Sequence, residues 1–401
     1  MTRNFVRHVY YELRKSFLSV WMLLFLVLLL LMNGWRLCTE YFNKTSEIAP
    51  YQTVYDEFYS RWSGNITTEN VSELMAIYSS LEEKQQNGEL SYQYDPNAYT
   101  YSDWTDMRFF ETLFLAEMRY DYLYQNKAIH IAENAQDLKN LYISNGNHFE
   151  ARKNHLVAEL FSGRRIEQFA DTHWAEVWLN HDYSSMIVLL LCLFGLSTVF
   201  VSEKETEMYM LLRTSKKGGV QAVGAKLLAG FLFSTTVAFL FYAEDSLLLL
   251  ALSAHPEALD SPVYAIRYLE TTPLTMSIGR FLLWTTALKT LGVWGCSCAI
   301  LLISCLCKRV LVSFVSGLGC MMILTVLQEF SRTRYGLKWF NPMELVVARD
   351  LITGTHFVNL FGYPVQIHVF ATVGVVLTVA CLCLGICCIH PGRVKRRIGT
   401  C

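Results

Sequence analysis

The residues of this chain that could do chemistry do not form a known catalytic motif. No His-Glu-x-x-His zinc motif and no Gly-x-Ser-x-Gly nucleophile motif occurs in the sequence. The nearest approach to a phosphate-binding loop is GVQAVGAK at 219–226, where Ala225 separates Gly224 from Lys226 and Leu227 follows the lysine. A phosphate loop needs lysine directly after the second glycine and then serine or threonine. We therefore predict that the chain hydrolyses no ATP, is not an enzyme and has no cofactor of its own.

The twelve cysteines give no metal site by their spacing. All of them lie outside residues 39–183, so that segment has no internal disulfide to stabilise it. Four gather near the C-terminus, in the order Cys381, Cys383, Cys387 and Cys388. Only His390 lies near them, and it is too little to complete a tetrahedral zinc site. We interpret these cysteines as small apolar helix residues and predict no metal site.

One polar segment, residues 203–217, combines acids, apolar residues and bases in that order. Glutamates suit the positive N-terminal end of a helix, and arginine or lysine suits its C-terminal end. The residues expected to form this short amphipathic helix are Glu203, Glu205, Glu207, Met208, Leu211, Leu212, Arg213, Lys216 and Lys217. Two interpretations have equal weight on physical grounds. The segment is either a solvated loop at a membrane surface or a helix that docks into a partner protein.

Lys289 is the clearest charge inside an apolar run. A charged residue within a membrane is costly and often functional, which would make it a substrate-binding or gating residue. The run at 278–307 is longer than one span requires, however. If the span begins near Leu291, the lysine extends to the outer surface, and we favour this second interpretation.

The composition identifies the elements that must position these residues. AVILMFWYC residues make up 53% of the 401 residues and charged residues only 17%, well below the roughly 25% of a soluble domain. The net charge of -1 gives no reason to expect a nucleic-acid partner. Apolar runs predict six membrane-spanning helices, at 17–37, 184–201, 227–242 with an extension toward 254, 278–307, 310–327 and 369–389. The first is too long for a signal peptide and lacks a cleavage site, so we expect it to remain as an anchor.

Charge predicts the orientation of these spans. Lysine and arginine gather before the first span, at 204–226, at 308–309 and after the last span, and all four segments fall on one face of a six-span arrangement. We therefore predict that both termini are cytoplasmic. Residues 38–183 then form a large extracytoplasmic domain, and the stretch 39–183 has 23 acidic and 11 basic residues. Apolar residues at 71–86 and 107–124 recur at helical spacing, so the domain should be mostly helical. The predicted fold class is an all-α integral membrane protein.

The layout and a few short motifs resemble a known family. A basic start, one span, a large outer domain and five further spans are similar to the permease subunit of type-2 ATP-binding-cassette (ABC) exporters of Gram-positive bacteria. ELRKSF at 12–17 resembles the N-terminal amphipathic helix of that family, and SCLCK at 304–308 resembles its Ser-x-x-x-Lys turn. The order of glutamate, Leu-Leu, Thr-Ser and lysine at 203–226 resembles its coupling loop. The chain departs from the family where Met208 and Tyr209 replace the usual glycine, and where Thr214 and Ser215 replace the usual proline.

The resemblance implies a division of labour. Residues 1–16 would form a cytoplasmic amphipathic helix, 17–37 the first span, and 184–401 a five-helix membrane domain with the coupling loop at 203–226. Two permease chains, identical or different, would form one path across the cell membrane. A separate cytoplasmic ATPase subunit would bind the coupling helix and supply the hydrolysis. The substrate would be a peptide, an antibiotic or a lipid-like molecule.

Other classes of membrane protein stay open. The main alternative is a sensor or scaffold whose outer domain binds a ligand and whose inner loop binds a signalling partner. A membrane-embedded enzyme would need paired polar residues at helical spacing within spans, and we find none. A secondary transporter would show internal repeats, which the large insertion after one span disrupts.

Overall fold

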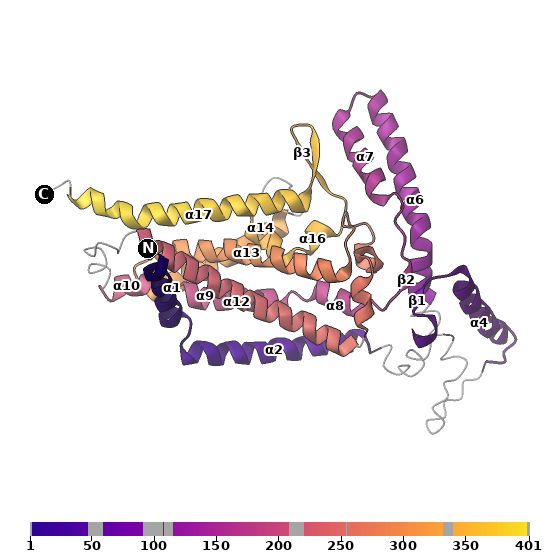
Figure 1. The fold of residues 1–401 in the computed structure, drawn as a ribbon, viewed down its shortest axis with the longest axis horizontal. Coiled ribbons are helices and arrows are strands. Elements are labelled where there is room, and N and C mark those ends of the chain that lie inside the picture. The colour runs from indigo at the N-terminus through magenta and orange to yellow at the C-terminus, as the bar shows by residue number, and fades with distance from the viewer. Residues whose placement is uncertain are drawn as a thin grey trace, which may run out of the picture.

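Six helices of the structure are long and apolar enough to cross a membrane, as the sequence predicted. The computed structural model describes residues 2–46, 59–90, 107, 115–207, 220–253, 255–331 and 340–398. The six spans lie roughly side by side (Figure 1). We call the end of this bundle that holds α1 and the end of α17 the near end, and the opposite end, with α8 and α16, the far end. Six apolar helices indicate a multi-pass membrane protein.

The spans and the helix that precedes them follow one another through the whole chain. α1 covers Thr2–Ser16 and α2, the first span, covers Val20–Lys44. The second span consists of three pieces, α8 (His173–Asn180), α9 (Tyr183–Leu196) and α10 (Val201–Glu205). The remaining spans are α12 (Val220–Ser253), α13 (Ile278–Leu306), α14 (Val310–Ser331) and α17 (Ile367–Ile398).

Two spans differ from their expected limits. The second is longer than 184–201, because the apolar α8 extends it toward the far end. The third begins at Val220, seven residues before the expected Leu227, and continues past Glu244 and Asp245 to Ser253, in agreement with the expected extension toward 254. At 34 residues, α12 is about 51 Å long, well beyond the roughly 30 Å of hydrocarbon in a bilayer.

The bundle has inner and outer spans. In the second and fourth spans, 78% and 67% of the most apolar window is buried, whereas in α2, α14 and α17 only 17% is buried. The inner helices pack closely where side chains are small. A Cβ on Gly292 or Gly295 of α13 would lie within 3 Å of Pro342 in α15 (Pro342–Val347). The outer spans leave wide apolar faces for lipid or another chain.

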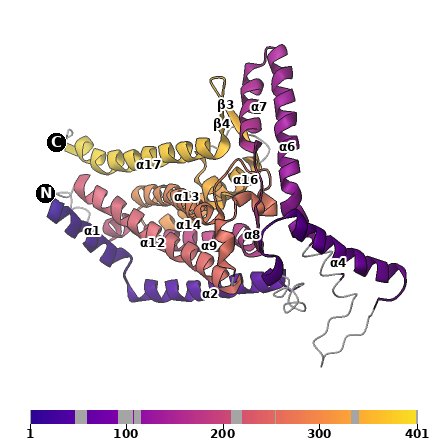
Figure 2. The same ribbon diagram turned by 45° about the vertical axis from the view of Figure 1, so that its right-hand side comes forward.

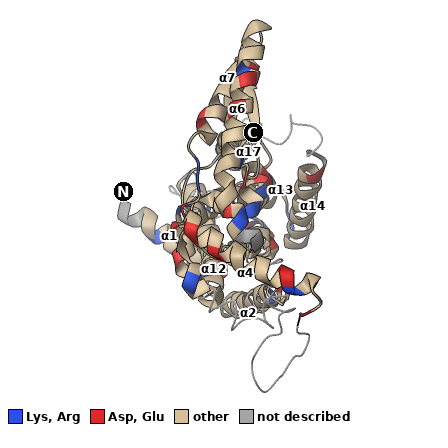
Figure 3. Ribbon diagram, turned by 90° about the vertical axis from the view of Figure 1, so that its right-hand side faces the viewer, with Lys and Arg blue, Asp and Glu red and all other residues tan. Residues whose placement is uncertain are grey.

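The segments beyond the far end are mostly helical. α4 (Thr68–Gln86), α6 (Leu115–Ser144) and α7 (His148–Phe161) lie between the first two spans in sequence. α6 and α7 form a hairpin that runs across the direction of the spans (Figure 2). The end-on view shows acidic and basic residues on α4, α6 and α7 (Figure 3). Helices are thus present over the expected 71–86 and over 115–124 of the expected 107–124, of which 108–114 lie outside the described residues. The extracytoplasmic location of these helices stays a prediction.

Short elements complete the far end. β1 (Gly64–Asn65) pairs antiparallel with β2 (Gln168–Phe169), and three 3-10 turns follow α12, η3 (Pro256–Asp260), η4 (Val263–Ala265) and η5 (Arg267–Leu269). α16 covers Arg349–Ile352. β3 (Phe357–Leu360) and β4 (Tyr363–Gln366) form a hairpin that leads directly into α17. Phe361 and Gly362 both have positive φ angles, as a two-residue hairpin turn requires.

Candidate functional site: two buried polar clusters

A buried ion cluster lies at the near end of the bundle. The Nζ atom of Lys226 lies 2.6 Å from Oε1 of Glu203 and 3.1 Å from both carboxylate oxygens of Glu12. Lys15 Nζ lies 3.4 Å from the same oxygen of Glu203. Lys226 is only 2% exposed, so its charge depends on these partners. The cluster joins α1, α10 and the start of α12.

Serine and lysine side chains next to the ion cluster bind the end of the second span to the end of α13. Ser304 Oγ accepts a hydrogen bond from the backbone N–H of Phe200 and donates one to the carbonyl of Ser197 at 2.9 Å. Lys204 donates to the carbonyls of Cys305 and Cys307 at the end of α13. The SCLCK segment singled out in the sequence therefore contacts the end of the second span. Movement of α10 would be transmitted directly to α13.

The structure describes three of the nine residues predicted to form the coupling helix. Glu203 is not on an outward face, because its carboxylate is buried in the ion cluster. Glu205 and Glu207 are exposed, and the positive φ of Glu207 ends the helical path there. The other six, Met208, Leu211, Leu212, Arg213, Lys216 and Lys217, lie outside the described residues. The coupling helix itself therefore stays a prediction.

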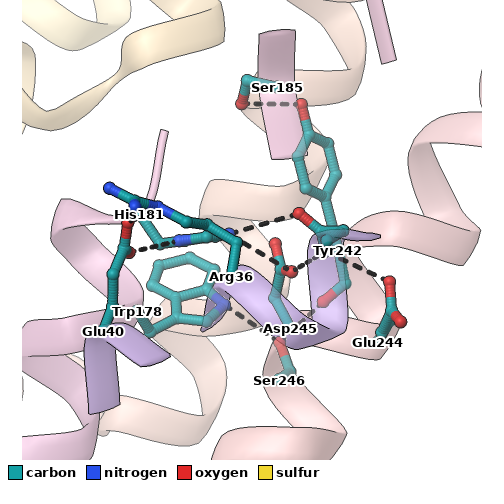
Figure 4. Close-up of polar contacts among 10 residues, drawn as sticks. Arg36, Glu40, Trp178, His181, Ser185, Tyr242, Glu244, Asp245 and Ser246 are labelled. Carbon is teal, nitrogen blue, oxygen red and sulfur yellow. Dashed lines mark hydrogen bonds and ion pairs between the residues drawn. The ribbon is translucent and has the colours of Figure 1, made fainter. Parts of the chain in front are cut away.

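A second polar cluster is buried between the spans toward the far end (Figure 4). Asn33 of α2 is fully buried, and its amide N–H₂ donates to Asp245 Oδ1 at 2.7 Å and to Glu244 Oε2 at 3.1 Å. His181, in the break between α8 and α9, lies 3.2 Å from Asn33 Oδ1 through Nε2 and 2.6 Å from Glu40 Oε2 through Nδ1. We call these five residues the far-end network. It joins α2, the second span and α12.

His181 connects two turns of α2 through its two ring nitrogens. The Asn33 amide turns its N–H₂ group to the two carboxylates, so its carbonyl oxygen faces Nε2 of His181. Glu40, which faces Nδ1 of the same ring, also accepts a hydrogen bond from Arg36 at 2.8 Å. The break between α8 and α9 is thus bound to the first span at two points.

Lys289 lies next to this network and is buried. It is 3% exposed and does not reach the outer surface, contrary to the interpretation we favoured. Its position eleven residues into α13 places it about 17 Å along the helix. Nζ lies 5.3 Å from the ring centre of Trp178 and 5.5 Å from that of Tyr242. It forms no hydrogen bond or ion pair within the described part of the chain.

Aromatic residues fix this environment. Trp178 donates from Nε1 to Ser246 at 3.1 Å, and the hydroxyl of Tyr242 lies 3.2 Å from Ser185 Oγ. Both rings therefore have set orientations beside Lys289. Lys289 therefore faces two aromatic rings, and Asp182 and Asp245 are the acidic groups that act on it electrostatically against the cost of its burial. An arrangement of this kind can bind or release a proton or pair with a ligand charge.

Sequence reasoning did not find the far-end network. Asn33 interrupts an otherwise apolar run, and a polar residue at that position was a usable indication of an internal partner. His181 and Glu40 gave no such indication, because both were assigned to the polar outer segment. Among the described residues no group of three His, Cys, Asp or Glu side chains could hold a metal ion. Comparisons with protein-family models and with curated proteins gave no match to this chain.

Proposed function

We propose that the chain is the membrane-spanning permease subunit of an ABC exporter. In this proposal the near end is cytoplasmic, the chain lies in the cell membrane, and a separate ATPase subunit binds the loop between α10 and α12. A second permease chain, identical or not, completes the path. The substrate class stays a peptide, an antibiotic or a lipid-like molecule.

The near-end ion cluster is the observation that supports this proposal. It joins the two ends of the coupling loop expected to dock on the ATPase, because Glu203 and Lys226 are the first and last residues of that loop. Both charges also reach α1, through Lys15 and Glu12. A force on the loop would therefore be carried into the second and third spans and into the N-terminal helix together. Coupling by a separate motor subunit requires such a connection.

Affinity co-purification of the tagged full-length chain from its native membrane tests the proposal. An ATPase subunit should accompany the intact chain and be lost from the variant L211D/L212D. The matched control is L138D/L141D, which alters two exposed leucines of α6 at the other end of the molecule. It should retain the ATPase. If no ATPase accompanies any of the three chains at equal membrane level, the proposal is wrong.

One observation favours a sensor or scaffold as the second candidate. A cavity of about 680 Å³ lies between α7 and the β3–β4 hairpin, with Arg164, Tyr264 and Phe357 among its lining residues. A ligand-binding outer domain would need such a cavity. In that case a cytoplasmic signalling protein, and no ATPase, would accompany the intact chain and be lost from L211D/L212D.

A further inference from the structure

An apolar pocket lies where α1 turns into α2. Its volume is about 340 Å³, and side chains of α1, α2, α9 and α12 line it. Leu13 and Phe17 form one wall, Leu23 a second, and Leu232 and Phe233 a third. Thr236 is the single polar residue of the lining, and we call this space the elbow pocket.

Close packing makes the elbow pocket a permanent feature of the fold. The rings of Phe17 and Phe233 are stacked, with centres 4.2 Å apart and planes 12° apart. Gly195 of α9 makes room for them, since a Cβ there would lie 2.7 Å from the Phe233 ring. The side chain of Ser19 accepts a hydrogen bond from the Met22 N–H and so begins α2 directly after the turn. The pocket therefore has fixed walls.

The position of the pocket limits what can fill it. Leu23 and Leu232 are each 44% exposed, so the pocket opens on the outer face of two membrane spans. A hydrocarbon-lined space this large is unfavourable when empty, and water does not fill an apolar cavity. The surrounding solvent at this level is lipid. An alkyl chain has the chemistry and the shape to enter.

Exposed cations of α1 indicate the head group. Arg7 and Arg14 of α1 are both exposed, and Tyr10 and Tyr11 between them are at least 60% exposed. The one acidic residue of α1, Glu12, is turned inward to Lys226. Arg14 directly follows Leu13 of the pocket wall in the sequence. The exposed side of α1 therefore complements a phosphate at the membrane surface.

We propose that the elbow pocket binds one acyl chain of a phospholipid and that Arg14 binds the phosphate of the same molecule. The inference stands independently of the permease proposal, because it rests on the pocket and on the charge of α1 alone. The same lipid would contact α1, α2 and α12, and so would stabilise the turn between the first two helices.

Photolabelling of the reconstituted full-length chain tests this proposal. Vesicles contain phosphatidylcholine and a phosphatidylglycerol that carries a diazirine on one acyl chain, and labelled peptides are identified by mass spectrometry. Thr236→Trp fills the pocket from an exposed position of α12, and Leu247→Trp, 67% exposed on the same helix, is the control. Labelling of pocket peptides should disappear in T236W and persist in L247W. Arg14→Gln should reduce it by about fivefold, and Arg7→Gln should not.

Three results would overturn the proposal. Equal labelling of T236W and L247W would mean that the lipid contacts are those of any exposed apolar face. Equal labelling of R14Q and R7Q would remove the phosphate contact. A homodimer of the intact chain that T236W converts to monomers would place a second copy in the pocket. If T236W does not fold, Leu23→Trp fills the pocket from α2 and is read in the same way.

Discussion

Replacing Asn33 by leucine tests whether the far-end network holds the first span to the bundle. Leucine has a similar size and suits the apolar run of α2, so the change removes the amide and little else. Asp245 and Glu244 would lose a donor, and His181 would lose its contact with the Asn33 carbonyl oxygen. The variant should therefore be less stable although its sequence is more hydrophobic.

The magnitude follows from the three hydrogen bonds. A hydrogen bond between membrane helices contributes about 0.6 kcal/mol on average and up to about 1.7 kcal/mol. The bonds to Asp245 and His181 are fully buried, so they belong near the upper value, whereas the bond to Glu244 is partly exposed and contributes less. We expect Asn33→Leu to lower the free energy of unfolding by about 3 kcal/mol.

Unfolding in mixed micelles with increasing SDS, followed by tryptophan fluorescence, measures this change. Met32→Leu is the matched control, because Met32 is the neighbouring residue and is 46% exposed. It should stay within about 0.5 kcal/mol of the natural chain. A double-mutant cycle with Asp245→Leu should give a coupling energy of about 1 kcal/mol or more. If Asn33→Leu and Met32→Leu unfold at the same SDS fraction, the network does not hold α2.

Three further results are expected. Burial opposes ionisation of Asp171, but hydrogen bonds and charge from the neighbouring His173 outweigh burial and lower the pKa of the Asp171 carboxyl. The ionised carboxylate therefore stabilises the fold at pH values above its ordinary pKa of 3.8. This stabilisation is lost as the pH falls through the lower folded-state pKa. Thermal unfolding of Asp171→Asn should therefore depend less on pH in that range. Gly295→Val should cost about 1–3 kcal/mol, because its Cβ would lie 2.5 Å from Pro342, whereas Gly319→Val, with open space around it, should be neutral in a thermal-shift assay. Lys226→Met should cost about 3–5 kcal/mol in SDS unfolding, because it leaves Glu12 without its cation and Glu203 with Lys15 alone.

The spans could be predicted from sequence because the length and apolar composition of a run are local properties. A run such as 310–327 is long and apolar wherever it packs, and α14 covers Val310–Ser331. The limits were less accurate where helices extend beyond the hydrocarbon. The second span shows this, because the expected 184–201 did not include α8, which begins at His173.

The polar clusters could not be predicted, because each depends on residues far apart in sequence. Asn33 and Asp245 are separated by 212 positions, and Lys15 and Glu203 by 188. Glu203 belonged to a local pattern that predicted an amphipathic helix, and a tertiary ion pair with Lys226 overrides that pattern for this one residue. Lys289 was expected at the surface because an unpaired buried lysine is costly, and the neighbouring rings of Trp178 and Tyr242 were not visible in the pattern.

The two clusters are placed on α12 at a spacing that matches a bilayer. Lys226 and Asp245 are nineteen residues apart on one unbroken helix, so they are separated by about 29 Å. This is close to the thickness of the hydrocarbon region. Both clusters then lie near its borders, where lipid head groups and water reduce the cost of charge, and residues 227–243 between them carry no charge. Because α12 is held to α1 and α10 at one border and to α2 and His181 at the other, any displacement of its near end must be carried to the far-end network.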